Sequence, residues 1–154
     1  QLGNMYIKTI HHEFTHILNQ VKDYPTSFRQ VTPNSYVNDS QFEETYVSNY
    51  LARGFISDYA QTEDREDFAE MVSEYVMHTA EWWEQQLQAA DKIWEGDINQ
   101  TQTVRSLIEQ KLDITRAYMH DTWNIDLDEL RDCILRRQDN VAAGLVNLTD
   151  LTVD

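Results

Sequence analysis

Apolar residues recur at helical spacing from Met5 to about Val21, which predicts a helix with one apolar face. We expect this face to enter the core. His12 and His16 would then lie on nearly the opposite side of the helix, facing a cleft. The apolar face consists of Ile7, Ile10, Phe14, Ile17, Leu18 and Val21.

A change of pattern marks residues 22–40, which contain both prolines and several Asn, Ser and Thr. This composition predicts a packed surface loop, with a short hairpin or a flap over the cleft as the alternatives. A second helix is expected over residues 41–53. Gly54 would end it, because glycine readily adopts the left-handed conformation at a helix terminus.

The strongest helical pattern follows a polar turn and runs to about residue 87. Thr62 or Asp64 can cap its start. We expect it to be one continuous helix, with a core stripe of Phe68, Val72, Tyr75, Val76, Trp83 and Leu87.

Two further helices are predicted in the last third of the chain. Gly96 interrupts the pattern, residues 104–119 resume it, and Asp126 can cap a final helix in which Cys133 takes a small core position. The four tryptophans are assigned to helix packing rather than to a pocket. Residues 141–154 suit either a strand or a loosely packed end. The predicted fold class is mainly α, since the 154 residues include only four Gly and two Pro.

The charge balance limits the partners of this chain. With 12 Lys and Arg against 27 Asp and Glu, the net charge is -15, which argues against nucleic acid and anionic membrane surfaces. The same charge would favour cationic peptides by long-range steering. No apolar run is long enough to span a bilayer, and a single cysteine excludes an internal disulfide.

The chemistry of the chain centres on its first predicted helix. His12, Glu13 and His16 form the H-E-x-x-H pattern of zinc hydrolases. The two histidines are one helical turn apart and can bind one metal ion, while Glu13 can act on a water molecule.

The class of zinc enzyme depends on the third ligand. A metzincin would need Gly and His where the chain has Asn19 and Lys22, so that class is excluded. A di-iron bundle needs a second E-x-x-H, which is absent. The third ligand must therefore come from farther along the chain, where Glu66 and Glu70 share one flank of a helix and Glu63 is an alternative.

The segment from Tyr59 to Glu70, YAQTEDREDFAE, resembles the second active-site segment of gluzincin peptidases related to the anthrax lethal factor protease domain. The resemblance implies that Glu66 is the third zinc ligand. It further implies that Tyr59 donates its hydroxyl to the developing oxyanion. Glu70 would be the carboxylate that orients a ligand histidine.

The two motifs together are similar to those of bacterial substrate import-associated zinc metallohydrolase lipoproteins. That resemblance implies an extracytoplasmic protein on the outer-membrane surface, associated with proteins of nutrient uptake. No lipoprotein leader is present in the chain.

The sequence therefore predicts one zincin-like helical domain over residues 1–154. We expect it to be the carboxy-terminal portion of a longer protein, without most of an upstream β-sheet lobe. Its predicted function is zinc-dependent hydrolysis of peptide bonds in a peptide or protein substrate. The alternative is a non-catalytic, zinc-stabilised binding or accessory module of a surface uptake system.

Overall fold

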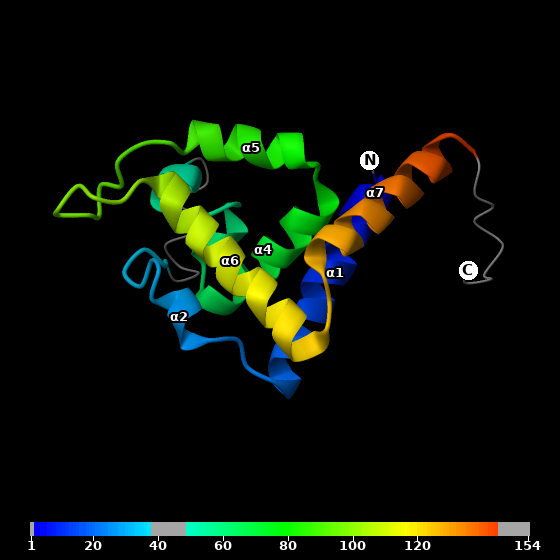
Figure 1. Cartoon of the computed structure of the whole chain (residues 1–154), viewed down its shortest axis with the longest axis horizontal. Helices are drawn as coiled ribbons and strands as arrows, with labels where there is room; N and C mark the ends of the chain where they lie inside the picture. Colours follow the sequence, from blue (N-terminus) through cyan, green and yellow to red (C-terminus); the bar gives the residue numbers. More distant parts are fainter. Residues whose placement is uncertain (1, 38–48, 145–154) are drawn as a thin grey trace.

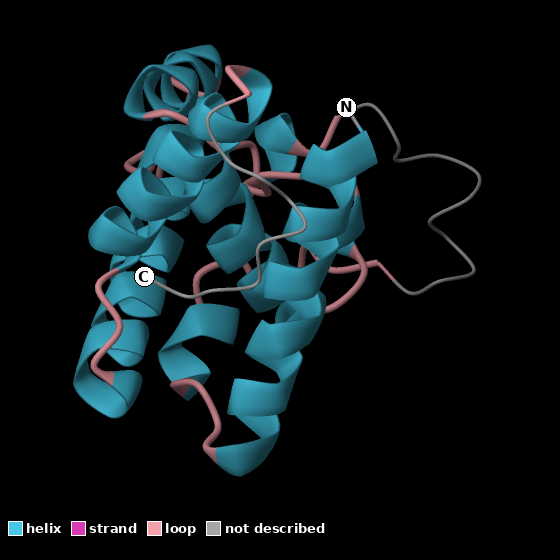
Figure 2. Ribbon diagram, turned by 90° about the vertical axis from the view of Figure 1, so that its right-hand side faces the viewer, coloured by secondary structure: helices cyan, strands magenta, loops and turns pink. Residues whose placement is uncertain are grey.

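Helices make up most of this computed structural model, which describes residues 2–37 and 49–144 (Figure 1). Within those residues no strand is present, and an isolated bridge joins Ile93 to Thr103 (Figure 2). The predicted mainly α class is confirmed. In chain order the elements are α1 (Leu2–Val21), α2 (Thr26–Arg29), η1 (Leu51–Arg53), η2 (Tyr59–Gln61), α4 (Asp64–Met77), α5 (Ala80–Ala89), α6 (Val104–Trp123) and α7 (Leu127–Ala142).

Helix α4 lies at the centre of the molecule, in contact with α1, α6, α7 and η2 (Figure 1). Every residue from Glu66 to Met77 is buried. Apolar neighbours surround Phe68, Met71 and Val76, which are fully buried. The same helix also buries acidic side chains, and each of these needs a hydrogen-bonding or charged partner to be tolerated there.

Helix α1 buries the face opposite to the one that we predicted. His12, Thr15 and Asn19 are buried, and of the predicted apolar face only Leu18 is. Ile10 is 63% exposed, and most of the remaining members are also open to solvent. The reason is that the polar face of α1 contacts the acidic side of α4, where its side chains find partners.

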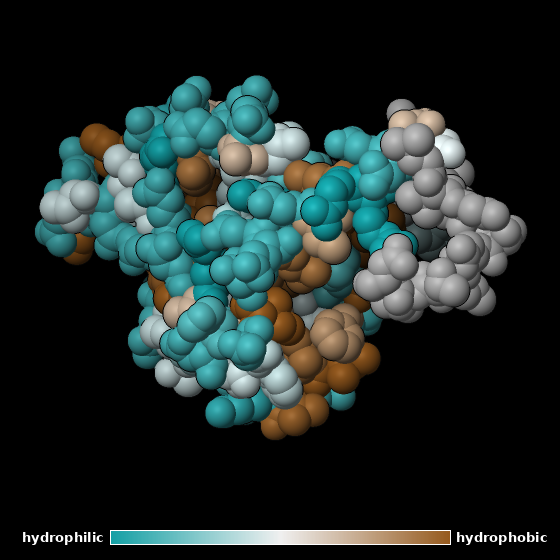
Figure 3. Space-filling model, turned by 45° about the vertical axis from the view of Figure 1, so that its right-hand side comes forward, coloured by the Kyte–Doolittle hydropathy of each residue, from teal (hydrophilic) through white to brown (hydrophobic). Residues whose placement is uncertain are grey.

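The exposed apolar face of α1 consists of Met5, Tyr6, Ile10, Phe14, Ile17 and Val21. In the space-filling view, apolar surface gathers in the lower half of the molecule, at the height where α1 ends (Figure 3). Polar residues cover most of the remaining visible surface. Across the part of the chain that the structure describes, no helix has the length and apolar character needed to cross a membrane.

The prediction of one continuous helix to residue 87 is wrong, because the structure divides this segment into two helices at His78. This residue adopts an extended conformation, and the Thr79 hydroxyl then caps α5 by accepting a hydrogen bond from the Trp82 amide. The predicted core stripe is confirmed on both helices. The N-cap of α4 is Glu63, not the predicted Thr62 or Asp64.

Several smaller predictions have clear outcomes. Gly54 ends η1 with a φ of 87°, as predicted, while residues 41–48 of the expected second helix lie outside the described residues. Within residues 22–37 the chain forms a packed loop with one helical turn at α2, and no hairpin is present there. Asp126 caps α7, as predicted. Cys133 is exposed and not in the core, because α7 covers α4 with only part of its surface.

The assignment of the four tryptophans to helix packing is confirmed, since each of them is buried in the core or packed against it. None of them lines the main cleft. Of the terminal segment, residues 145–154 lie outside the described part of the chain.

A buried ion pair fixes α6 against α4. The Lys111 ammonium lies 2.7 Å from Asp67 Oδ2 and donates to the Gly54 carbonyl, and both charged side chains are fully buried. The same ammonium lies 4.0 Å from the centre of the Phe55 ring. Burial lowers the pKa of Lys111 and raises that of Asp67, while attraction within the pair opposes both shifts. Lys111 thus joins α6, α4 and the segment that follows Gly54.

We predict that Lys111→Met lowers the free energy of unfolding by about 3–5 kcal/mol, because it leaves the Asp67 carboxylate buried without its countercharge. Chemical denaturation of the metal-free protein measures this change. The exposed Lys92→Met is the matched control and should be close to neutral. A Lys111→Met protein as stable as the control would contradict this account.

Candidate metal centre

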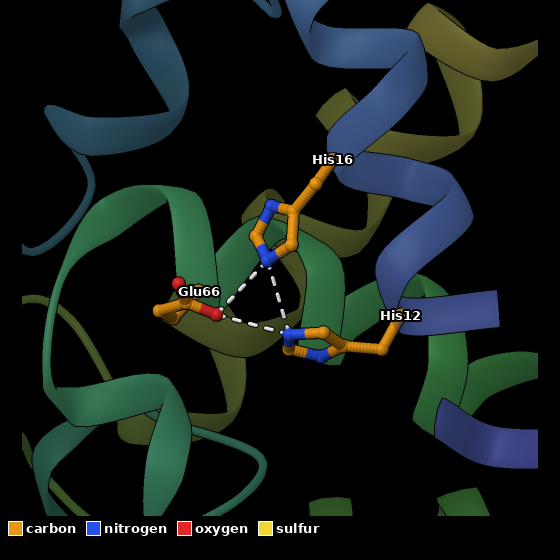
Figure 4. A group of neighbouring side chains, drawn as sticks. All are labelled: His12, His16 and Glu66. Carbon is orange, nitrogen blue, oxygen red and sulfur yellow. Dashed lines mark hydrogen bonds and ion pairs between the residues drawn. The ribbon is translucent and has the colours of Figure 1, made fainter. Parts of the chain in front are cut away.

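Three side chains from two helices converge on one point. His12 and His16 come from α1, and Glu66 comes from the first turn of α4 (Figure 4). Glu66 Oε2 lies 2.9 Å from His12 Nε2 and 3.0 Å from His16 Nε2, and the two nitrogens are 3.1 Å apart. The three donor atoms therefore form a nearly equilateral triangle.

The triangle has the dimensions of a zinc site. Zinc bonds of about 2.0–2.1 Å in a tetrahedron separate two donors by about 3.3 Å. The observed separations are smaller by a few tenths of an ångström, so a small outward movement would place all three donors at bonding distance. His-His-carboxylate is also the donor set of catalytic zinc sites, in which a fourth position remains for water.

Hydrogen bonding also favours a cation at this point. His12 Nδ1 lies 2.8 Å from Glu70 Oε1, so a neutral His12 ring carries its proton on Nδ1 and a lone pair on Nε2. That lone pair faces the Glu66 carboxylate, which is also an acceptor. A bound cation removes the repulsion between the two acceptors.

Glu70 lies one turn after Glu66 on α4 and holds the far side of the His12 ring. Burial alone would raise its pKa, but the hydrogen bond with His12, the charge of Lys8 and the Ser57 hydroxyl lower it to about 2. Burial disfavours the charged form of His12, yet the charges of Glu70 and Glu66, and the hydrogen bonds that a protonated ring donates to both, raise the pKa of that ring overall. Glu70 is therefore an ionised carboxylate that fixes the His12 tautomer.

A cleft of about 890 Å³ opens over the three donors. Glu13 is exposed and lines this cleft beside the histidines. Tyr59, at the start of η2, also lines it, with its ring centre 5.8 Å from that of His12 and 44% of the residue exposed. The structure thus brings the two histidines, Glu13, Tyr59, Glu66 and Glu70 to one cleft.

Glu63, the alternative third ligand, lies elsewhere. Its carboxylate pairs with the Arg65 guanidinium at 2.7 Å, and it is not part of the group that could bind a metal. His78 pairs with Glu74 instead of joining the cluster. The remaining histidines, His11 and His120, are also outside the group.

Two residues of the site escaped the sequence analysis. Lys8 and Ser57 both contact Glu70 and are placed there by the packing of α1 and of the segment before η2 against α4. For Lys8 a usable signal existed, because it is one helical turn before His12 and shares its face. Ser57 had no comparable signal.

Comparison with known proteins identifies the family. Residues 1–128 match the family model described as "Putative zinc-binding metallo-peptidase". The chain belongs to this family. The prediction of zinc as the metal agrees with the family's description, and no curated protein matches the chain.

A solved structure is also similar to this chain. It is described as a putative zinc-binding metallo-peptidase from Bacteroides caccae, with a TM-score of 0.77 and 28% sequence identity. The match covers 96% of this chain and 51% of that one. The present chain therefore spans about half the length of the solved relative.

We predict that Glu66→Gln weakens zinc binding by more than about 100-fold, since it removes a charged donor and not merely an outer partner of a ligand. Competition with a chromophoric chelator measures the affinity. Glu63→Gln is the matched control, three residues away and outside the donor triangle. Loss of affinity in the control, or full affinity in Glu66→Gln, would contradict the assignment of the third ligand.

Acid should reveal the contribution of Glu70 to stability. Its pKa is about 2 in the folded protein against an ordinary 4.5, so the ionised carboxylate stabilises the fold above pH 4.5. This contribution is lost as the pH falls from 4.5 toward 2. The difference in unfolding free energy between the metal-free wild type and Glu70→Gln should shrink over that interval. A difference that stays constant, or grows on acidification, would be the contrary result.

Proposed function

We propose that this protein is a zinc-dependent metallopeptidase that hydrolyses peptide bonds with a metal-activated water. The observation that carries this proposal is the convergence of two imidazole nitrogens and one carboxylate oxygen in an open cleft that Glu13 also lines. His12, His16 and Glu66 would hold the zinc ion.

Zinc in such a site, when bound, polarises the substrate carbonyl and makes water a better nucleophile near neutral pH. The chain supplies the proton transfers. Glu13 follows His12 in α1 and is exposed to the cleft, where it can accept a proton from the attacking water and pass it to the leaving amine. Because its side chain is exposed, Glu13 can reach both the attacking water and the leaving amine.

Tyr59 is the proposed donor to the oxyanion. It reaches the cleft from η2, which the Asp58 carboxylate caps by accepting a hydrogen bond from the Tyr59 amide at 2.8 Å. A donor placed where negative charge develops contributes about 3 kcal/mol to the lowering of the barrier. The nearness of its ring to His12 supports this role.

We further propose, from the resemblance of its motifs, a gluzincin-type enzyme on the bacterial outer-membrane surface, beside proteins of nutrient uptake. The substrate would be a peptide or protein, since the lining of the cleft extends from Met5 near the start of α1 to Tyr24 just beyond its end. A cationic substrate would gain from the net charge of -15.

Glu13→Gln tests the enzyme assignment. We predict that this variant retains zinc and loses at least about 100-fold in peptide turnover, the lower range of what a general base contributes. Turnover of a mixed peptide library, followed by mass spectrometry, measures the loss. Glu81→Gln, an exposed glutamate of α5 outside the cleft, should leave turnover unchanged.

The result separates two functions. Zinc-dependent cleavage that disappears in Glu13→Gln supports the peptidase. Stoichiometric zinc in a wild-type protein that cleaves no member of the library would contradict catalysis and favour a zinc-stabilised binding or accessory module.

A further inference from the structure

We propose that Lys8 is a positioning residue of the metal centre, which acts by fixing the Glu70 carboxylate that in turn orients His12. This inference rests on the proposed metal site and adds to it a residue that contacts Glu70 and not the metal ligands themselves. Neither the H-E-x-x-H pattern nor the segment from Tyr59 to Glu70 includes Lys8.

The two oxygens of Glu70 have different partners. Oε1 lies 2.8 Å from His12 Nδ1, and the Lys8 ammonium donates to Oε2 at 3.0 Å. A rotation of the carboxylate that lengthened one contact would also disturb the other. Lys8 therefore restricts the orientation in which Glu70 meets the imidazole.

A regular register along the seam between α1 and α4 explains why Lys8 takes this place. His16 meets Glu66, His12 meets both Glu66 and Glu70, and Lys8 meets Glu70 and Glu74. From one pair to the next, the residue number falls by four on α1 and rises by four on α4. The helices are thus antiparallel, and Lys8 occupies the next position of the series that the two histidines begin.

The charge of Lys8 balances two buried carboxylates. Glu70 and Glu74 are one turn apart on α4, both buried, and the Lys8 ammonium lies 3.0 Å from the first and 2.5 Å from the second. Without this cation the two carboxylates would repel each other across one helical turn. Glu70 would then move away from the position in which it holds His12.

Lys8 also remains accessible enough to be changed without opening the core. Its side chain is 33% exposed and lines the cleft together with Thr9 and His12. A methionine of similar length can follow the same path along α1 without the ammonium charge. The substitution therefore removes the ion pairs while leaving the packing of the helix largely in place.

The test compares Lys8→Met, Lys8→Arg and Lys22→Met in the full 154-residue chain. Lys22 follows the end of α1, is exposed and lies outside the cleft lining, so it is the matched control. Three quantities are measured for each protein: zinc affinity, the visible spectrum of bound Co²⁺, and the unfolding free energy of the metal-free form.

We expect Lys8→Met to bind zinc about tenfold more weakly, the lower range for loss of an outer partner of a metal ligand. Its Co²⁺ spectrum should change because the His12 donor is reoriented. Lys8→Arg should restore most of the affinity, because it keeps the charge, and Lys22→Met should match the wild type.

Two results would overturn the proposal while leaving the metal centre intact. One is a Lys8→Met protein with wild-type zinc affinity and Co²⁺ spectrum. The other is a loss of affinity that Lys8→Arg does not restore and that scales with lost stability, which would make Lys8 structural only. Wild-type protein that binds no zinc would overturn the metal centre and this inference together. Zinc binding without peptide hydrolysis would contradict the proposed function alone.

Discussion

The arrangement of the whole molecule depends on the polar seam between α1 and α4. Helix α4 is buried from Glu66 to Met77, and acidic side chains recur every turn along the side that meets α1. Such groups are tolerated in a protein interior only when paired. The histidines and Lys8 of α1 supply the partners in one antiparallel register, so a shift of one residue along the seam would leave buried carboxylates uncompensated.

This constraint accounts for the orientation of α1. Amphipathic periodicity identified the helix and its two faces, and the helix is present over nearly the expected range. Periodicity alone could not show which face is buried, because the usual preference for the apolar face is overridden when the polar face has specific partners on α4. Ile10 and Val21, at 63% and 72% exposed, are the clearest consequence.

Local sequence patterns do not show which distant elements come into contact, and this explains which parts of the site could be predicted. The spacing of His12 and His16 is a local property of one helix, and the motif from Tyr59 to Glu70 is continuous in sequence, so both were accessible. The roles of Ser57 and Lys111 depend on contacts between elements far apart in the chain. Lys8 shares a helix face with His12, but its partner Glu70 also comes from a distant element. The division of the long predicted helix at His78 was also missed, since the apolar periodicity continues across the break and only the Thr79 cap marks it.

A second set of contacts connects the core to the cleft. Asp67 follows Glu66 in α4 and points the other way, to the buried Lys111, which also holds the Gly54 carbonyl. Tyr36 donates a hydrogen bond to the same carboxylate. The sides of this helical turn that face the histidines and the core are thus anchored separately, which leaves Glu66 little freedom to move away from the histidines.

The central claim is that one zinc ion binds between α1 and α4. The most direct measurement is diffraction from zinc-equilibrated crystals of this chain at the zinc absorption edge. The account predicts one strong anomalous peak within bonding distance of His12 Nε2, His16 Nε2 and Glu66 Oε2. A peak at another position, or no peak at these three atoms, would contradict it.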